Sequence, residues 1–377
     1  LVLAMPGWGN GEQGGPSGAL ERGWLVGFWP VGLFVLWALA APSLAGHVPS
    51  ATGIAQTLEW LAIPVAATAW SRMDGRGRAI VVGAVAATLL VSCAVAGLQH
   101  FGVWPPPDAF EPFRFTRIPF QRVYEPVPGM EGRFMGGGLA FHRLKFAHIG
   151  GLAALGLLVG GLRSRGRLRG LLLACAFAGI VSIAVFPYAR AASAALLIAG
   201  VVAGVIASSR KRAAFAVGAA LAAAALLLLA SIAPLRERFL SSITPAGSGD
   251  RQVLLASGVA VVHSHPWTGI GPGNFRAMDH VGPDAADHLR TQPGKAHNQF
   301  LSMATEAGIP GALFFCAMLI GLARWMSGSS APGAFGLSAL VFFVLLSMVH
   351  DPLFQASFSM ALILALGIGC ARRVEPA

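Results

Sequence analysis

Apolar residues occupy long, nearly unbroken blocks of this chain and do not follow the spacing of amphipathic helices. Each block is long enough to cross a hydrocarbon layer about 30 Å thick, which takes about 20 helical residues. The pattern therefore predicts an all-α polytopic membrane protein with about ten transmembrane helices. The predicted spans cover residues 24–46, 52–70, 78–99, 139–162, 169–188, 191–208, 213–233, 309–326, 331–350 and 352–371.

The composition supports this fold class. Of the 377 residues, 55% are hydrophobic and 11% are charged, whereas soluble domains carry about 25% charged residues. All four cysteines lie in or at the ends of apolar blocks and form no CxxC pair, so we predict neither a disulfide framework nor a zinc site. They are Cys93, Cys175, Cys316 and Cys370.

The net charge of +11 could indicate a nucleic-acid binder, but the chain has no basic helix with interleaved aromatic residues. Many arginines instead form short clusters between apolar blocks, where they set topology. With the N-terminus inside, the clusters within residues 72–78, 163–169, 210–212 and 372–373 all face the cytoplasm. We therefore predict an N-in, C-in topology and no nucleic-acid partner.

Two long polar segments then lie outside the cytoplasm. The larger one is too long for a structureless loop in a compact protein, so we expect it to be partly helical. Its helix should cover residues 251–263, with Asp250 as N-cap and Pro266 beyond its end. The predicted organisation is a cytoplasmic tail over 1–23, seven helices over 24–233 that enclose the external loop 100–138, a large external loop over 234–308, and three helices with a second tail over 309–377.

The tail over residues 1–23 is not interpreted as a cleavable signal peptide, because the first apolar block is too long for one. An N-terminal truncation is the alternative explanation for its polar, glycine-rich start.

His297 is the main candidate for chemistry. It precedes the eighth predicted span, so it should lie near the outer membrane–water boundary, close to the start of a helix. An imidazole there can act as a general base near neutral pH, and Asn298 could orient the ring or the substrate. Glu306 is a carboxylate near or below that interface, where charge is costly. The alternative is that His297 and Asn298 only cap the helix and that Glu306 pairs with an arginine.

Several basic residues are candidates for binding an anion at the same face. Arg190 lies at the outer tip between the fifth and sixth spans, where the positive-inside rule disfavours arginine. Arg251 begins the predicted loop helix, and Arg143 and Lys145 lie at the entry to the fourth span. The planar guanidinium suits bidentate phosphate binding. Binding to lipid phosphates is the alternative for each.

A glycine-rich segment over residues 269–275 permits a tight turn, and Gly271 and Gly273 could bind substrate through exposed N–H groups, with an ordinary structural turn as the alternative. No strand precedes it, so it is not a dinucleotide motif. The loop also holds acidic and histidine residues that could form a metal site, but they are few and are separated by glycine and proline. We predict no metal and no cofactor. The residues considered were Asp279, His280, Asp284, Asp287 and His288.

In combination, these motifs resemble the signature of the O-antigen ligase and polymerase superfamily. The resemblance covers about residues 139–326, although the family often has more spans than we predict here. Ala189 and Ala191 stand where serine and glycine are common beside Arg190, which weakens that match. The motifs are residues 296–301 with Glu306, Gly308 and Gly311, the preceding segment 266–275, and the arginines Arg251 and Arg190.

The resemblance implies a glycosyltransferase of the bacterial inner membrane with its active site on the periplasmic side. Such proteins transfer a glycan from an undecaprenyl-diphosphate carrier to an acceptor hydroxyl, as O-antigen ligases of lipopolysaccharide biosynthesis do. An O-antigen polymerase and a protein O-oligosaccharyltransferase are alternatives within this group. A transporter or flippase is a more distant alternative, disfavoured because the ionisable residues gather at the outer face.

Carried onto this sequence, the resemblance assigns a role to each candidate. His297 would take the acceptor proton, and Arg190 and Arg251 would bind the diphosphate, with Arg143 and Lys145 in support. The transfer would be inverting and independent of a metal. The expected partners are the lipid-linked donor, a lipid or glycan acceptor and membrane lipids, whereas acceptor identity, sugar specificity and oligomeric state are not predicted.

Overall fold

The computed structural model describes residues 17–104, 125–208, 218, 245–282, 289, 294–327 and 330–371. Within these residues the chain is helical, and its β-pairing is the isolated bridge between Pro126 and Phe134. The chain forms two compact units. The first contains the described parts of residues 72–239 and 329–342, and the second contains those of residues 12–71, 240–328 and 343–377.

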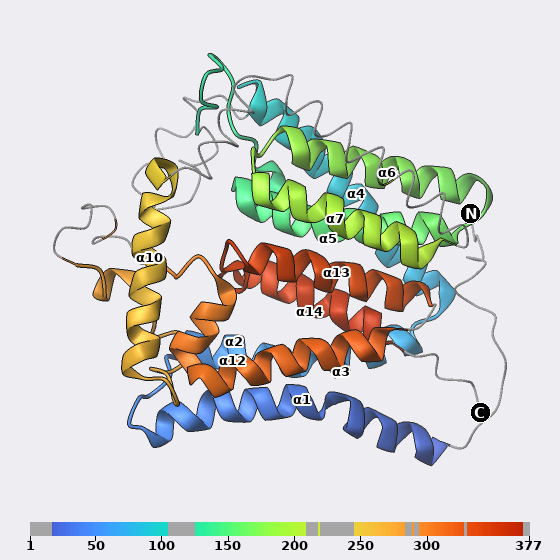
Figure 1. Cartoon of the computed structure of the whole chain (residues 1–377). Helices are drawn as coiled ribbons and strands as arrows, with labels where there is room; N and C mark the ends of the chain where they lie inside the picture. The colour runs from blue at the N-terminus through green and yellow to red at the C-terminus, as the bar shows by residue number, and fades with distance from the viewer. Residues whose placement is uncertain are drawn as a thin grey trace. The chain divides into compact units, whose positions relative to one another are not determined.

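Four helices lie side by side in the first unit (Figure 1). The side chain of Asp74 begins the first of them by accepting a hydrogen bond from the N–H of Gly77 at 2.7 Å. Small residues allow close helix approach: a Cβ on Gly161 would lie 2.8 Å from the side chain of Leu173 in the next helix. The helices are α4 (Gly75–His100), α5 (Arg143–Arg163), α6 (Gly166–Val185) and α7 (Arg190–Ala207).

In the second unit, α1 (Ser17–Leu44) packs along α12 (Gln299–Met326), and α10 (Pro245–Ser264) lies across one end of them (Figure 1). Helix α13 (Ala331–Ser347) begins in the first unit and ends in the second. The other elements of the second unit are α2 (Ala51–Leu58), η1 (Glu59–Leu61), α3 (Ala62–Arg72), η5 (Ala277–Asp279), η6 (Pro352–Phe354) and α14 (Ala356–Cys370).

Five described helices are long and apolar enough to cross a membrane: α4, α5, α6, α7 and α12. Three shorter apolar helices cover Phe28–Leu44, Ala331–Ser347 and Ala356–Cys370. All eight coincide with predicted spans, so a helical multi-pass membrane protein is confirmed. The predicted span 213–233 lies outside the described residues but for Gly218, and the total of about ten spans stays a prediction.

One predicted span is wrong in detail. Residues 52–70 do not form a continuous helix but are divided into α2, η1 and α3. Pro64 removes the N–H that the carbonyl of Trp60 would use, and the chain tightens into a 3₁₀ turn just before it. The predicted span also contains a carboxylate, Glu59, which stands at the start of the 3₁₀ turn and accepts a hydrogen bond from Ser359 at 2.8 Å.

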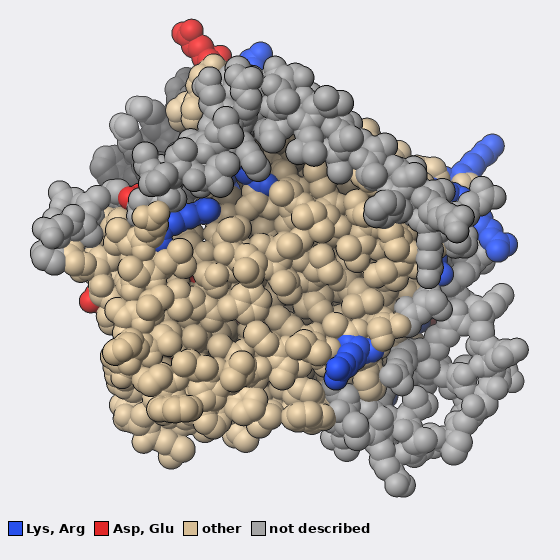
Figure 2. Space-filling view, viewed as in Figure 1, with Lys and Arg blue, Asp and Glu red and all other residues tan. Residues whose placement is uncertain are grey.

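The outer surface of the helices fits a lipid environment. Figure 2 shows that the face over α1 and α12 is almost entirely uncharged. Large apolar side chains project from both helices, with Leu36 and Leu313 more than 60% exposed. Exposed apolar area of this extent marks a surface that is covered by lipid or by another apolar partner.

The large loop has a core of its own. A buried cluster ties α10 to the segments that follow it, so the loop is a folded element as we expected. The predicted helix start was wrong: α10 begins at Pro245, and Asp250 lies inside it rather than at its N-cap. Proline suits the first turn of a helix because its missing N–H has no intrahelical partner there. The cluster consists of Leu254, Val261, Phe275, Ala277, Leu289 and Ala296.

Candidate functional site

His297 lies in the turn that immediately precedes α12. Its backbone is left-handed, with φ +54°, a conformation that is uncommon outside glycine and is concentrated at functional sites. Asn298 is the N-cap: its Oδ1 accepts from the N–H of Leu301 at 3.0 Å, and its Nδ2 donates to the carbonyl of Met348 at 3.3 Å. The capping role that we considered therefore belongs to Asn298, which fixes the position of His297 beside it.

The electrostatic surroundings of His297 favour a neutral ring. Burial lowers the pKa of His297 below its ordinary value of 6.5, and the positive charge of Arg251 lowers it further. Within the described residues, Nδ1 is buried without a hydrogen-bond partner. The ring lies edge-on to His350, with centroids 6.0 Å apart. A neutral imidazole of this kind can accept a proton at pH 7.

Arg251 reaches the same region from the other end of the loop. It is half-buried in α10, which packs against α12. Although 46 positions separate Arg251 from His297 in the sequence, its charge acts on the histidine ring. The structure therefore brings together two of the three residues that we predicted to be catalytic.

Asp351 was missed by the sequence analysis. Its side chain accepts a hydrogen bond from Ser302 at 2.5 Å, which ties the start of η6 to α12. Burial raises the pKa of Asp351 from 3.8 to about 6, with a further increase from Glu306, and the hydrogen bond from Ser302 and the charge of Lys295 oppose this rise. The residue lies between two predicted spans at the outer face, and a carboxylate in so short a connection was the signal that could have identified it.

Glu306 forms an ion pair with Lys295, at 2.6 Å between Oε1 and Nζ. Both side chains are largely buried, with 11% and 14% exposed, so the two charges compensate each other in a low-dielectric environment. Glu306 therefore supports a basic residue, as one of our interpretations held, but that residue is a lysine. Lys295 was also missed, although it stands only two positions before His297.

Helix α12 is broken at Gly308, whose φ of +74° and ψ of 172° are not helical. Pro310 has no N–H, so the carbonyl of Glu306 lacks its usual helix donor. The N–H of Gly271 replaces that donor at 2.9 Å. Three more hydrogen bonds satisfy the break: Ile270 N–H to the Thr305 carbonyl at 3.0 Å, Ile309 N–H to the Pro266 carbonyl at 2.8 Å, and Trp37 Nε1–H to the Ala307 carbonyl at 3.0 Å.

The glycine-rich segment thus has a structural role, as the alternative of an ordinary turn held, and that role is to bond to the break in α12. We expected exposed N–H groups, but that of Gly271 is used inside the protein. Gly269 and Gly308 sit where the loop touches the helix break: a Cβ on Gly308 would lie 2.3 Å from the carbonyl oxygen of Trp267. Gly273, with φ +78°, packs equally closely against Ser50 at the start of α2. Substrate binding by Gly273 stays a prediction.

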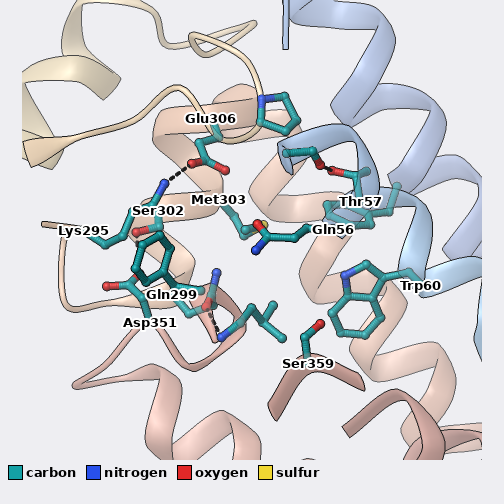
Figure 3. Close-up of a pocket in the computed structure, with 15 residues that line it drawn as sticks. Gln56, Thr57, Trp60, Lys295, Gln299, Ser302, Met303, Glu306, Asp351 and Ser359 are labelled. Atoms are coloured by element: carbon teal, nitrogen blue, oxygen red, sulfur yellow. Dashed lines mark hydrogen bonds and ion pairs between the residues drawn. The ribbon is translucent and has the colours of Figure 1, made fainter. Parts of the chain in front are cut away.

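A pocket in the second unit opens beside this cluster (Figure 3). Its empty space is about 530 Å³, a figure that includes space open to solvent. Lys295, Glu306 and Asp351 lie on one side of it, and Trp60 and Ser359 lie on the other (Figure 3). The remaining lining residues are Phe34, Gly53, Gln56, Thr57, Pro272, Gln299, Ser302, Met303, Leu353 and Phe354.

The other predicted basic residues belong to the first unit. Arg190 is the first residue of α7 and follows Tyr188, whose φ is +50°. Arg143 is the first residue of α5 and pairs with Glu125 at 2.8 Å, and Lys145 follows in the same turn. A helix N-terminus favours anions, so these positions suit a phosphate. Their substrate roles stay predictions.

Left-handed backbone outside glycine occurs at three places in the described residues: Phe141, Tyr188 and His297. Each lies within two residues of a helix start that carries a predicted site residue. The predicted site residues were chosen for their side-chain chemistry, whereas this backbone strain is a separate observation at the same three places. It supports their functional importance.

The hypothetical metal ligands of the loop are only partly described. Asp279 pairs with Arg276 at 2.9 Å, and His280 stacks on Phe275 with centroids 6.0 Å apart. Asp284, Asp287 and His288 lie outside the described residues.

A family model described as O-antigen ligase matches residues 175–316 of the chain. The matched segment runs from α6 into α12 and includes Arg190, Arg251 and His297. No curated protein matches the chain. The match confirms the resemblance to the O-antigen ligase superfamily over this segment, and at the family level it supports membrane-bound glycan transfer.

Proposed function

We propose, on the premise that residues 175–316 carry an O-antigen ligase region, that this protein transfers a glycan from an undecaprenyl-diphosphate-linked donor to an acceptor hydroxyl on the periplasmic face of the bacterial inner membrane. The observation that supports it best is that the charge of Arg251 acts on the ring of His297, whose neighbours Lys295 and Gln299 line a polar pocket in the second unit. A base and a phosphate-binding cation side by side are what this reaction requires.

His297 is the proposed general base. The acceptor O–H gives its proton to the imidazole while the oxygen forms a bond to the anomeric carbon of the donor sugar. The bond from that carbon to the diphosphate breaks, and the electron pair leaves with the lipid diphosphate. Attack from the side opposite the leaving group inverts the configuration. The lowered pKa of His297 keeps the ring unprotonated, and thus able to act, at neutral pH.

Arg251 is proposed to bind the diphosphate and to stabilise the charge that develops on it. Its guanidinium offers several donors in a fixed plane, and no metal is required for such electrostatic stabilisation. We propose the same role for Arg190, with Arg143 and Lys145 in support, on the basis of the sequence. Arg143 would exchange its partner Glu125 for phosphate in that case.

Asp351 and the pair Lys295–Glu306 are proposed to hold the base in place. Asp351 is bound to Ser302 and lies beside the backbone of His297, so it links the turn of the base to α12. Acting through His297, it is a positioning residue.

The proposal is tested by reconstituting the full chain in lipid nanodiscs with a synthetic undecaprenyl-diphosphate trisaccharide and rough lipopolysaccharide. We expect transfer of the trisaccharide with release of the lipid diphosphate, at an undiminished rate in EDTA. Absence of transfer to rough lipopolysaccharide, to free glycan and to peptide hydroxyls alike would contradict glycan transfer, and loss of transfer in EDTA would contradict metal independence.

A further inference from the structure

We infer that the pocket between α2, α12 and α14 binds one uncharged sugar ring of the acceptor and presents its hydroxyl to His297. The inference rests on the proposed function and names the substrate class of one of its subsites. The evidence for it is the set of residues that line the pocket and the donors and acceptors among them that are not used within the protein (Figure 3).

Gln299 is the first of these groups. Its side chain lines the pocket, and the residue is only 3% exposed. Its Oε1 accepts a hydrogen bond from the N–H of Leu353 at 3.1 Å, which fixes the orientation of the amide. The Nε2 group is then the donor end, and within the described residues it has no protein partner. Because the side chain lines the pocket, a ligand there can accept a hydrogen bond from this free donor.

Gln56 supplies a second free amide. It projects into the pocket from α2, on the side opposite Gln299 (Figure 3), and none of the described hydrogen bonds involves its side chain. An amide offers two donor hydrogens and one acceptor oxygen, the combination that matches neighbouring hydroxyls on a ring. Two amides on facing walls could therefore hold a polyhydroxylated ligand from both sides.

Trp60 supplies an apolar face. Its indole ring is held by edge contacts to Phe34 and Phe315, with centroids 6.4 and 5.6 Å away, and it lines the pocket. A rigid aromatic ring beside hydrogen-bonding groups suits the C–H face of a sugar while the hydroxyls meet the amides. An acyl chain would leave both amides unsatisfied, which disfavours lipid as the occupant.

The charges argue against the donor diphosphate as the occupant. Lys295 is the pocket's only cation among the lining residues, and Glu306 neutralises it at 2.6 Å. Asp351 adds a further acidic group. The pocket therefore has no spare positive charge for a phosphate or a uronic acid, so the ring that it accepts is uncharged.

The position of the pocket relative to the base identifies the acceptor. Gln299 and Lys295 each stand two residues from His297, one on either side of it. A ring between Gln299 and Gln56 would therefore lie beside the segment that carries His297, although His297 itself does not line the pocket. The donor sugar is instead tied to a diphosphate, for which this pocket has no spare positive charge.

Michaelis constants in reconstituted nanodiscs test the inference. The probes are rough lipopolysaccharide ending in a glucose residue as acceptor and undecaprenyl-diphosphate trisaccharide as donor. We expect Gln56→Leu to raise the KM for the acceptor about 3- to 10-fold, the effect of one or two lost hydrogen bonds, and to leave the KM for the donor unchanged. Gln299→Glu keeps the acceptor for the Leu353 N–H but removes the amide donor, so it serves as the second variant and should raise the KM for the acceptor alone.

The matched control is Thr52→Val, an exposed polar position of the same helix α2 that does not line the pocket. Unchanged constants in both Gln56→Leu and Gln299→Glu would overturn the inference. A raised KM for the donor alone would assign the pocket to the donor glycan and overturn the acceptor assignment. A wild-type preference for an acceptor ending in glucuronic acid would overturn the uncharged ring.

The same assay separates the two proposals. If the wild-type protein transfers no glycan, the proposed function has failed. If it transfers glycan and the pocket variants behave like wild type, only the inference about the pocket has failed.

Discussion

The N–H of Gly271 donates to the carbonyl of Glu306 at 2.9 Å, and this hydrogen bond fastens the external loop to the break in α12. The carbonyl is available because Pro310 cannot donate to it. On the other side of the same residue, the Glu306 carboxylate holds Lys295. Glu306 thus binds the external loop through its backbone carbonyl, and it fixes Lys295 in the wall of the pocket through its carboxylate.

Replacing the base should remove activity and preserve the fold. We expect His297→Ala to lower kcat by about 10²- to 10⁴-fold, the contribution of a general base, with normal insertion and thermal unfolding. His263→Ala, at an exposed histidine at the end of α10, is the control and should retain wild-type turnover. Wild-type turnover by His297→Ala would remove it from the mechanism.

Replacing Arg251 should change both the rate and its pH dependence. We expect Arg251→Ala to lower kcat about 10²- to 10³-fold through lost charge stabilisation. The guanidinium also lowers the pKa of His297, so its removal should raise that pKa and move the acidic limb of the residual kcat–pH profile to higher pH. Arg276→Ala, which breaks only an exposed ion pair in the same loop, is the control. An unmoved acidic limb would show that the two residues do not interact.

Asp351 should make the protein less stable as the pH rises. Its folded-state pKa of about 6 exceeds the ordinary 3.8, so between these values the folded state binds more protons than the unfolded state. Stability from this group is present below about pH 4 and is lost as the pH rises towards 6. Asp351→Asn should therefore raise Tm at pH 7.5 relative to wild type and have little effect at pH 4.

The measurement is thermal unfolding of both proteins in the same detergent at the two pH values. A wild-type advantage in Tm at pH 7.5 would contradict a destabilising carboxylate. The activity profile separates positioning from packing: if Asp351 positions His297, kcat falls in Asp351→Asn while KM for the donor stays constant.

Breaking the Lys295–Glu306 pair should cost more than removing it. Each single variant, Lys295→Met or Glu306→Gln, leaves one largely buried charge without its partner, for which about 3–5 kcal/mol is typical. The double variant removes both charges, and we expect it to recover much of the lost thermal stability. If the Tm of the double variant is no higher than that of the less stable single variant, the two charges are not coupled.

The glycine at the helix break should not tolerate a side chain. Gly308→Ala would put a Cβ 2.3 Å from the Trp267 carbonyl oxygen and hold alanine at φ +74° and ψ 172°, a region used almost only by glycine that costs about 1–3 kcal/mol. We expect a clear drop in Tm together with reduced transfer. Gly32→Ala in α1, where a Cβ meets nothing within 4 Å, is the matched control and should unfold at or above the wild-type temperature. Equal Tm values for the two variants would contradict the close approach.

The sequence was most informative where local chemistry decides structure. Apolar blocks predicted the described long helices, and Asn298 is at a helix start as expected, with His297 just before it. The sequence was least informative where a residue's partners lie elsewhere in the chain. Lys295 pairs with Glu306 and Asp351 is bound by Ser302, and no local pattern encodes those partners. The segment 52–70 was mispredicted because apolar content does not reveal a helix break.

The hydrogen bonds across the break in α12 also limit how the protein can be recombined. A chimera that exchanges only the external loop with a homologue would cut the bonds from residues 266–271 to residues 305–309 and the contact of Gly273 with Ser50. A chimera meant to change which acceptors are used should therefore exchange three segments together: the external loop, α12 and the start of α2.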